Sequence, residues 1–458
     1  MSSKKPSPNS QTFSNTTDGL AKVNLNATSR PQYKNIDVVA EYEKARKGKK
    51  STSFVVVGHV DAGKSTLMGR LLLELKFVDK QTVEKYRRQA EKIGKQSFEL
   101  AWVMDQTQEE RDRGVTMDIA TNHFETEKTK FTILDAPGHR DFIPNMIAGA
   151  SQADFAILVI DAGEGAFEKG LKGQTYEHVL LLRSIGIHRI IVAVNKMDTI
   201  GWSKDRFDEI CQQVTGFLQG KRFLLKNISF VPIAGFDGSN VTCAPRQKEA
   251  VWYRGSTLLE QLDSVEPAPR SLNGPFRMAI SEIWKSHLGK ATMSGRLAKG
   301  TIQVGDAIIL QPSGESGYIK SLMADNELRE WAVAGENVSI TVVGIDLDNV
   351  KAGDYACSAE KPLECGTGFT MKAMAFDHLM PMLIDLHRGR LHSAGKVTEL
   401  AALLDISTGE IVKSRPKVVK PGEVARVRVS LTHKVPLEAG QRVVIRSDGE
   451  TIAAGVVE

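Results

Sequence analysis

The apolar residues in the first half of the chain fall into short runs separated by longer stretches of mixed polarity. Three of these runs are rich in Val, Ile, Leu and Phe, as the buried strands of a parallel sheet are: residues 54–57, 131–134 and 190–194. Residues 64–75 instead place Leu67, Leu71 and Leu72 on one helical face. This alternation predicts an α/β domain over residues 51–268.

The pattern changes after the sequence Pro267-Ala-Pro269. Short β-branched runs between Gly and Asp turns, as in residues 295–306 and 350–354, replace the alternation of strand and helix. Similar runs continue to residue 458, which predicts two β-barrels, domain II over residues 269–361 and domain III over residues 362–458. The histidines of this half lack the spacing of metal ligands or of a catalytic triad: His287, His378, His387, His392 and His433. We therefore expect both barrels to serve recognition.

The first fifty residues form the basic part of the chain. They contain ten Lys or Arg against four Asp or Glu, a charge of +6 against +5 for the whole chain, so the remainder is near neutral at −1. Residues 1–35 are too poor in apolar groups to fold alone, which predicts a disordered arm. Val38, Val39, Tyr42 and Ala45 favour a short helix within residues 36–50, leading into the first domain. The arm is either an RNA-attracting polycation or a solvated tail, and both interpretations stay open.

Composition indicates where such a protein works. At 458 residues the chain has room for about three domains, and 41% hydrophobic residues is ordinary for a soluble protein. No apolar run approaches the ~20 residues of a membrane span, and the N-terminal stretch is polar rather than signal-like. The four scattered cysteines lack zinc-ligand spacing and cannot make a disulfide framework. We expect a cytoplasmic protein with reduced thiols and no membrane partner.

A glycine-containing loop follows the first predicted strand, with the sequence Gly58-His59-Val60-Asp61-Ala62-Gly63-Lys64-Ser65. Between a buried strand and a helix, such a loop surrounds phosphate oxygens with backbone N–H groups and the helix dipole. We expect Lys64 to reach the β and γ phosphates and Ser65 to place its hydroxyl on Mg²⁺. The nucleotide-binding residues expected here are His59, Val60, Asp61, Ala62, Gly63, Lys64, Ser65 and Thr66.

Two further positions complete a magnesium-nucleotide site. Asp135 ends the second predicted strand, at the edge where open α/β sheets bind ligands, and is suited to hold Mg²⁺ through a water. Gly138 can bring its N–H to the γ phosphate, so this loop would change shape when that phosphate leaves. Thr116 follows a charged stretch, residues 79–113, that is expected to be helical and solvated, and its hydroxyl would hold that stretch in the GTP state. The expected metal ligands are Ser65, Thr116 and Asp135.

The sequence Asn195-Lys196-Met197-Asp198 follows the third predicted strand. Guanine presents N1–H and its exocyclic amine as donors, and one carboxylate accepts both, so Asp198 favours guanine over adenine. Asn195 can hydrogen-bond the base, and the Lys196 stem can cover its face. We expect the loops after these strands to meet at three neighbouring strand tips and to bind GTP and GDP.

Residues 52–458 resemble the translational GTPases of the elongation factor one alpha branch. Beyond the phosphate-binding loop, the likeness rests on four strings: Ser97-Phe-Glu-Leu-Ala-Trp102-Val-Met-Asp105, Arg111-Asp-Arg-Gly-Val-Thr116-Met-Asp118, Asp135-Ala-Pro-Gly-His139-Arg-Asp-Phe142 and Gly173-Gln174-Thr175-Tyr-Glu-His178. The resemblance implies ribosome-stimulated hydrolysis of GTP to GDP. It also implies that His139 positions the attacking water, with Val60 and Val115 beside it as an apolar gate.

The resemblance assigns a last base-contacting loop to residues 231–236, with contacts from Ala234, Gly235 and Phe236. Ala234 stands where a serine is usual in the family, which removes a supporting hydrogen bond. The backbone N–H groups of Ala234 and Gly235 are still expected to meet the guanine oxygen.

Within this branch, three kinds of GTPase compete: the elongation factor that carries aminoacyl-tRNA, the release-factor GTPase, and the Pelota-partner GTPase of ribosome rescue. The last is the most similar, through strings such as Phe142-Ile-Pro144-Asn-Met146, Leu258-Leu-Glu-Gln-Leu-Asp263-Ser264 and Thr451-Ile-Ala-Ala-Gly-Val-Val457. That placement implies a monomer that delivers a tRNA-mimicking Pelota-type protein to the A site of a stalled ribosome. It then hydrolyses GTP and dissociates, in ribosome rescue, no-go decay and mRNA surveillance.

Two interpretations from other classes stay open. The GTPase subunit of a sulfate-activating enzyme shares this domain plan, and a sulfurylase partner rather than the ribosome would stimulate it. A nucleotide-binding scaffold without turnover would bind GTP and release no phosphate.

Overall fold

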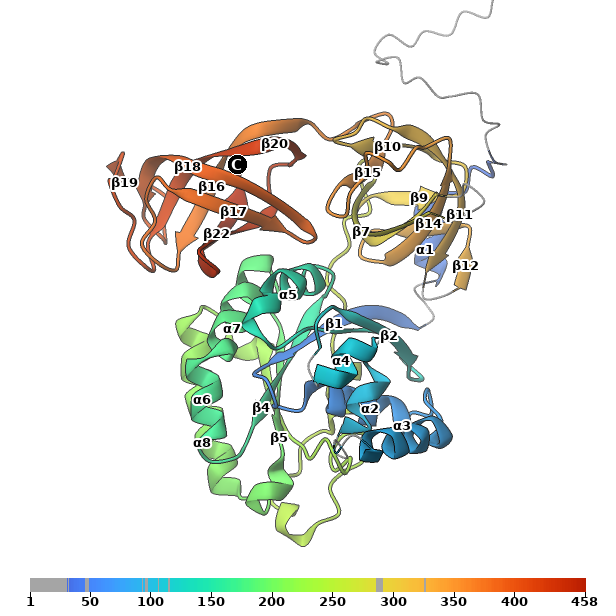
Figure 1. Ribbon diagram of the computed structural model, residues 1–458, viewed down its shortest axis with the longest axis vertical. Helices are drawn as coiled ribbons and strands as arrows, with labels where there is room; N and C mark the ends of the chain where they lie inside the picture. Colours follow the sequence, from blue (N-terminus) through green and yellow to red (C-terminus); the bar gives the residue numbers. More distant parts are fainter. Residues whose placement is uncertain are drawn as a thin grey trace, which may run out of the picture.

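The computed structural model describes residues 31, 33–45, 49–92, 94, 98–105, 107–113, 116–285, 291–324 and 327–458. Within these ranges the chain forms an α/β domain with two β-barrels above it (Figure 1). This is the predicted fold class. The predicted arm lies mostly on residues 1–30, outside the described ranges, so its disorder stays a prediction.

A six-stranded sheet forms the centre of the α/β domain, in the order β2-β3-β1-β4-β5-β6. Its strands are β1 (Lys50–Gly58), β2 (Ala120–Glu125), β3 (Thr129–Asp135), β4 (Phe155–Asp161), β5 (Ile190–Asn195) and β6 (Ile228–Pro232). All neighbours are parallel except β2 and β3. Strands β1, β3 and β5 confirm the three predicted strands. Because the unpredicted β4 lies between β1 and β5, however, the loops after those three strands are not all on neighbouring strands.

Helices cover both faces of the sheet, because successive side chains of a strand point to opposite faces. The helices are α2 (Lys64–Glu74), α3 (Lys80–Lys92), α4 (Gln108–Arg113), α5 (Ile143–Ala150), α6 (Ala166–Lys172), α7 (Gln174–Ile185), α8 (Lys204–Gly220) and α9 (Leu258–Asp263). On β1, Val55 and Val57 join a buried cluster with α5, α7 and α8, whereas Phe54 and Val56 join one with α2 and α9. None of the helices in the described ranges has the length and apolar character needed to cross a membrane.

The charged stretch between α2 and β2 is only partly solvated, which corrects the prediction for residues 79–113. Helices α3 and α4 are separated by a segment in which Leu100, Trp102 and Met104 are 1%, 2% and 1% exposed. The segment lies so close to α2 that a side chain at Gly69 would overlap the carbonyl oxygen of Leu100. The segment that leads to Thr116 is therefore packed against α2, the helix after the phosphate-binding loop. The apolar residues that make this contact are few and are surrounded by charged residues in the sequence.

Barrel II is closed by six strands in the order β10-β15-β7-β8-β14-β11, because β11 also pairs with β10. These strands are β7 (Arg277–Lys285), β8 (Ala291–Lys299), β10 (Ala307–Gln311), β11 (Ser316–Ala324), β14 (Asn337–Val343) and β15 (Tyr355–Ser358). Strand β12 (Glu327–Arg329) extends the sheet, and β9 (Thr301–Gln303) pairs with β13 (Trp331–Val333). Along β8, Ala291, Met293 and Leu297 alternate with more exposed residues, so one face of the strand fills the barrel.

Barrel III is closed in the same way, in the order β17-β21-β22-β16-β20-β18, with β18 pairing back to β17. Its strands are β16 (Cys365–Ala375), β17 (Leu383–Arg388), β18 (Leu391–Leu404), β20 (Val424–Pro436), β21 (Arg442–Ser447) and β22 (Glu450–Val457), with β19 (Ile411–Ser414) at the edge. The predicted boundaries after residues 268 and 361 fall in the segments between α9 and β7 and between β15 and β16. The four cysteines of the chain are free thiols.

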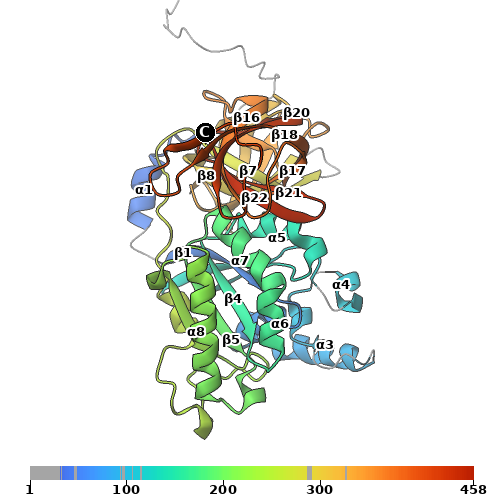
Figure 2. The same ribbon diagram turned by 90° about the vertical axis from the view of Figure 1, so that its left-hand side faces the viewer.

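Helix α1 (Val38–Ala45) lies on barrel II, not on the α/β domain into which it was expected to lead (Figures 1 and 2). It contacts β9 and β13, and its first residue, Val38, is 5% exposed. Just before the helix, the N–H of Ile36 donates to Gln303 Oε1 at 2.9 Å. The short apolar face of α1 therefore finds its partner in a strand pair that lies more than 250 residues away in the sequence, beyond the reach of a local pattern.

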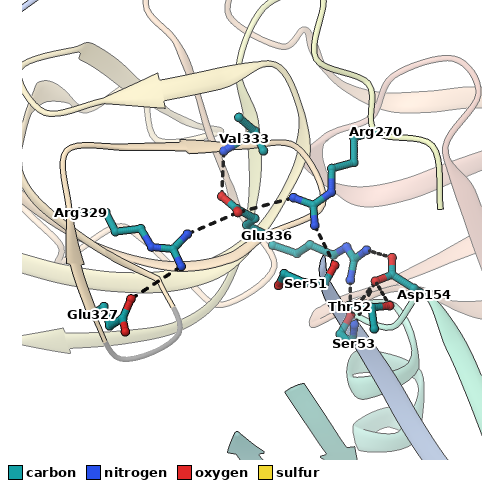
Figure 3. Close-up of polar contacts among 10 residues, drawn as sticks. Ser51, Thr52, Ser53, Asp154, Arg270, Glu327, Arg329, Val333 and Glu336 are labelled. Carbon is teal, nitrogen blue, oxygen red and sulfur yellow. Dashed lines mark hydrogen bonds and ion pairs between the residues drawn. The ribbon is translucent and has the colours of Figure 1, made fainter. Parts of the chain in front are cut away.

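Buried charged contacts join barrel II to the edge of the sheet opposite the nucleotide loops (Figure 3). Arg296 of β8 lies 2.5 Å from Asp154 Oδ1, and the two side chains are 16% and 9% exposed. Burial would raise the pKa of the Asp154 carboxyl, but Arg296 and hydrogen bonds from Ser53 and Thr52 hold it below its usual value. Nearby, Arg270 donates to the Ser51 carbonyl oxygen at 2.9 Å and lies 3.5 Å from the buried Glu336. Both arginines thus hold barrel II against the start of β1.

We predict that Arg296→Ala lowers the free energy of unfolding by about 3–5 kcal/mol, because the buried Asp154 carboxylate loses its cation. Urea unfolding at neutral pH measures the loss. The control is Arg428→Ala, which breaks a pair with Glu399 whose side chains are 61% and 31% exposed, and which should change stability by less than about 1 kcal/mol. Because the folded pKa of Asp154 is depressed, the effect of Arg296→Ala should shrink as the pH falls through that pKa. Equal losses in the two variants would contradict this assignment.

Candidate functional site

The phosphate-binding loop is formed by residues 59–63, between β1 and α2. Gly63 precedes the helix with φ 88°, a left-handed conformation that favours glycine. A Cβ at Gly63 would also lie 2.6 Å from Asn195 Nδ2. Glycine is therefore required here by the backbone angle and by the neighbouring side chain, and the first turn of α2 opens with its N–H groups free of a side-chain cap.

Lys64, the first residue of α2, is 7% exposed. Its ammonium donates to the His59 carbonyl oxygen at 3.0 Å, and no carboxylate lies within ion-pair distance of it in the part of the chain that the structure describes. Burial lowers the pKa of Lys64, and the charges of Asp135 and Asp61 oppose that effect. A Cβ at Gly138 would collide with this ammonium. The absence of a side chain at Gly138 keeps open the space beside a buried, unpaired cation, as an anionic ligand requires.

Three oxygen-bearing side chains meet beside Lys64. Ser65 Oγ donates to Asp135 Oδ2 at 2.6 Å and lies 3.2 Å from Thr116 Oγ1. Asp135 is fully buried and its Oδ1 has no hydrogen-bond partner among the described residues. Burial raises the pKa of Asp135 to about 6, although Ser65 and Lys64 act in the opposite direction.

These oxygens fit a hard cation such as Mg²⁺, which takes one or two protein ligands together with phosphate oxygens and waters. The orphaned Asp135 Oδ1 is the clearest mark of such a site. Within the described ranges, no group of three or more His, Cys, Asp or Glu could form an all-protein metal cage. The predicted ligand set, Ser65, Thr116 and Asp135, is therefore brought together in space, and its binding of Mg²⁺ stays a prediction.

At the base end of the site, Asn195 joins two loops. Its Nδ2 donates to the Ala62 carbonyl oxygen at 2.9 Å, and its Oδ1 accepts from the Gly235 N–H at 2.8 Å. One amide hydrogen of Asn195 is left for a base. The Ala234 N–H donates to the Ser239 carbonyl oxygen at 3.0 Å. Both backbone donors expected to meet the guanine oxygen, Ala234 and Gly235, thus have protein acceptors in this structure.

One open cleft brings most of the predicted residues together. It has a volume of about 440 Å³, within the usual range for small-molecule sites. The predicted residues that line it are Val60, Asp61, Gly63, Lys64, Ser65, Thr66, Thr116, Gly138, His139, Asn195, Lys196, Asp198, Gly235 and Phe236. Ala62, Asp135 and Ala234 are buried behind the lining, and His59 lines a second cavity behind the loop. Val115 lies outside the described residues.

His139, the predicted catalytic residue, lies on the loop after β3 and its side chain is 43% exposed. Its Nδ1 is 3.3 Å from the Asp141 N–H, which donates to it, and 3.4 Å from Asp141 Oδ2. When Nδ1 accepts, the neutral ring carries its proton on Nε2. The histidine is therefore fixed at one ring nitrogen, and the other is left for a ligand or a water in the cleft.

Three residues of the site were not predicted from the sequence. Asp161, at the end of β4, lies 2.7 Å from Lys196 Nζ and so fixes the side chain whose stem is expected over the base.

The second unpredicted residue is Glu110, which accepts from the N–H groups of Met117 and Asp118, next to Thr116. Burial alone would raise the pKa of Glu110, but these hydrogen bonds hold it below its usual value. Gln174 accepts from the Val60 N–H at 3.3 Å. Asp161 could have been found from the apolar run that precedes it, whereas the other two become visible only in the fold.

Comparison with known proteins finds similarity along almost the whole chain. The family description "Elongation factor Tu GTP binding domain" matches residues 49–268, "Elongation factor Tu domain 2" matches residues 291–357, and "Elongation factor Tu C-terminal domain" matches residues 384–458. These matches cover the α/β domain and most of each barrel.

Two curated relatives are nearly equal in identity. Protein HBS1 of Drosophila melanogaster is 39% identical over 430 residues, which cover 91% of this chain and 64% of that protein, so the chain spans less than two thirds of its length. Elongation factor 1-alpha of Ignicoccus hospitalis is 38% identical over 430 residues, which cover 90% of this chain and 97% of that protein. Among solved structures, the Ski7 GTPase-like domain of S. cerevisiae bound to GTP has a TM-score of 0.75 at 19% identity, covering 93% of this chain and 100% of that one. At that identity it supports the fold alone.

We predict that Asp198→Asn weakens GTP binding by about 1.5–3 kcal/mol, about 10- to 150-fold, because the carboxylate expected to accept two guanine donors is lost. Xanthosine triphosphate, which has a carbonyl in place of the exocyclic amine, should bind the variant better than the wild type. Calorimetric titration with both nucleotides measures the exchange. Asp205→Asn, an exposed carboxylate on α8 outside the cleft, is the matched control. Unchanged preference for GTP in Asp198→Asn would contradict the base assignment.

Proposed function

The chain belongs to the elongation factor Tu and elongation factor 1-alpha family of translational GTPases, and on that premise we propose that it delivers a tRNA-mimicking protein of the Pelota type to the A site of stalled ribosomes. It would leave after hydrolysing GTP, and so serve ribosome rescue and mRNA surveillance in the cytoplasm. The observation that carries the proposal is the similarity to Protein HBS1 along 91% of the chain, together with the strings that resemble the Pelota-partner branch.

The chain is a GTP hydrolase, and its site residues suggest how it works. Phosphoryl transfer to water requires an in-line nucleophile and stabilisation of charge on the equatorial oxygens, without covalent catalysis. The buried Lys64 ammonium and the N–H of Gly138 line the cleft and would stabilise such charge. His139, held at Nδ1, would orient the water through the other ring nitrogen. Because His139 is exposed, we expect slow turnover until the ribosome fixes its position.

Mg²⁺ is the proposed cofactor of this site. Bound there, the ion would neutralise charge on the β and γ phosphates. The hydroxyls of Ser65 and Thr116 would be its ligands, and Asp135 would hold a water on it. Ser65 lies on α2 and Asp135 on β3, and both elements are packed in the core. Loss of the γ phosphate would therefore free the segment before β2 that carries Thr116 and change the loop after β3.

The histidines of the two barrels lack the sequence spacing of metal ligands or of a catalytic triad, so recognition is the proposed role of the barrels. Hydrolysis in the GTPase domain would set how long a recognised partner is held. A second candidate function is carriage of aminoacyl-tRNA. The observation that favours it is the 38% identity to elongation factor 1-alpha, which covers 97% of that protein. The release-factor GTPase and the sulfate-activating GTPase subunit stay as further alternatives from the sequence.

The proposal predicts which partner the GTP-bound chain prefers. Purified protein is locked with a non-hydrolysable GTP analogue and mixed with equal amounts of a Pelota-type protein and aminoacyl-tRNA. We expect the Pelota-type protein to be retained at least about tenfold better, a difference of about 1.4 kcal/mol. GDP should remove the preference. Stronger retention of aminoacyl-tRNA would contradict the rescue assignment and support the second candidate.

We further predict that His139→Ala lowers the rate of ribosome-stimulated phosphate release by a factor of about 10²–10⁴, because the attacking water loses the group that positions it. GTP affinity should stay within about twofold, since binding rests on the loop, the helix and the base contacts. Phosphate release with vacant ribosomes and nucleotide titration measure the two effects. If His139→Ala releases phosphate at the wild-type rate, the catalytic role of His139 is refuted. If the unmodified protein releases no phosphate at all, the chain is a nucleotide-binding scaffold.

A further inference from the structure

Helix α7 connects the back of the phosphate-binding loop to barrel III. At its first residue, Gln174 Oε1 accepts the N–H of Val60 at 3.3 Å. One turn later on the same helix, Glu177 faces barrel III, where its Oε1 accepts the Thr451 hydroxyl at 3.0 Å. One helix thus contacts the loop with its first side chain and barrel III with its fourth.

The bond from Gln174 fixes one particular peptide unit. The N–H of Val60 and the carbonyl of His59 belong to the same planar peptide group, so the direction of one sets the direction of the other. That His59 carbonyl oxygen accepts the Lys64 ammonium at 3.0 Å. The same oxygen accepts the Ala62 N–H at 3.3 Å. Gln174 therefore helps to set where the acceptor of Lys64 points, although it lies 110 residues away from Lys64 in the sequence and does not line the cleft.

The surroundings make this bond hard to replace. Behind the loop is a cavity of about 150 Å³ lined in part by His59, Val60 and Thr175. His178, one turn after Gln174, is fully buried, and neither ring nitrogen has a hydrogen-bond partner among the described residues. Burial, Lys64 and His59 lower the pKa of His178 to about 3, so its ring stays neutral. The Gln174–Val60 bond is itself part-buried, so removing its acceptor leaves the Val60 N–H partly shielded from water, which is unfavourable.

The other end of the connection is well packed. Val444 of β21 and Ala454 of β22 belong to the same buried cluster as Val179 and Leu182 of α7. Arg446 lies 3.9 Å from Glu177, beside the Thr451 contact. Figures 1 and 2 show α7 directly beneath these strands. A shift of barrel III across this interface would consequently move the helix that carries Gln174.

We infer that Gln174 is a positioning residue for GTP hydrolysis, and that α7 sets its position according to the docking of barrel III. Gln174 acts by orienting the His59–Val60 peptide and, through it, the Lys64 ammonium. It does not touch the nucleotide cleft. The inference concerns hydrolysis by the chain itself and is independent of the partner that the chain delivers.

The first test removes the acceptor while keeping the volume. Gln174→Met should lower the single-turnover rate of GTP hydrolysis by about tenfold or more, because a displaced charge-stabilising group loses much of its effect. The Kd for GTP should change less than about threefold, since the other loop and base contacts persist. Gln174→Glu keeps an oxygen acceptor and should restore the rate to within about threefold of wild type. A wild-type rate in Gln174→Met, or equal losses in both variants, would overturn the role of Gln174.

The second test asks whether barrel III acts through this residue. Thr451→Val removes the hydroxyl that binds Glu177 and should lower the hydrolysis rate about two- to fivefold. In the double variant with Gln174→Met, the rate should be no lower than in Gln174→Met alone, since both changes act through one connection. Thr432→Val, an exposed threonine of barrel III that bonds only within its barrel, is the matched control and should leave the rate unchanged. Additive losses would overturn the coupling step.

All of these rates are measured on the isolated full chain, without ribosomes, tRNA or a Pelota-type protein. A failure of the partner proposal therefore leaves these measurements interpretable. Thermal unfolding of each variant separates a loss of positioning from a loss of folding, because a purely structural role would lower the melting temperature and GTP affinity together and could not be rescued by Gln174→Glu.

Discussion

The buried ammonium of Lys64 is the constraint on which the site depends. A charge removed from water is unfavourable unless an opposite charge or several dipoles replace the lost solvation. Here the described chain offers a single carbonyl oxygen at 3.0 Å and no paired carboxylate. Gly138 leaves space beside the ammonium, and Asp135, which accepts from Ser65 at one oxygen, has no partner for the other among the described residues. The protein part of the site is thus electrostatically incomplete, as the site of an anionic phosphate chain would be.

The two barrels are attached to the GTPase domain at different places. Barrel II is held chiefly through Arg296 and Asp154, at the edge of the sheet remote from the nucleotide. Barrel III packs Val444 and Ala454 on α7, where Arg446 also lies 3.9 Å from Glu177. A second ion pair joins Arg390 of barrel III to Asp118, two residues after Thr116, at 3.1 Å. Because these contacts lie on α7 and beside Thr116, barrel III is better placed than barrel II to act on the nucleotide loops.

Local sequence patterns were enough to predict those elements and residues whose structure depends on neighbours a few positions away in the sequence. The loop from Gly58 to Ser65, helix α2 and the buried Asp135 at the end of β3 all follow from short apolar runs and their polar ends. The docking of α1 on barrel II, the bridge made by Asn195 and the hold of Gln174 on Val60 could not be predicted, because each joins residues more than 100 positions apart. The buried residues Leu100 to Met104 were missed for a related reason, since their apolar character is diluted by the charges around them.

The bridge made by Asn195 has a consequence for fidelity. Through two hydrogen bonds, the Asn195 side chain links Ala62 of the phosphate-binding loop to Gly235 of the loop expected to contact the base. A purine that fits poorly against Gly235 would weaken the Asn195 contacts and so the order of the phosphate-binding loop. In the same way, a nucleotide that lacks its phosphates would leave the base-contacting loop less ordered. Base recognition and phosphate binding would then be coupled through one side chain, and an incorrect nucleotide would be disfavoured both when it binds and when it is hydrolysed.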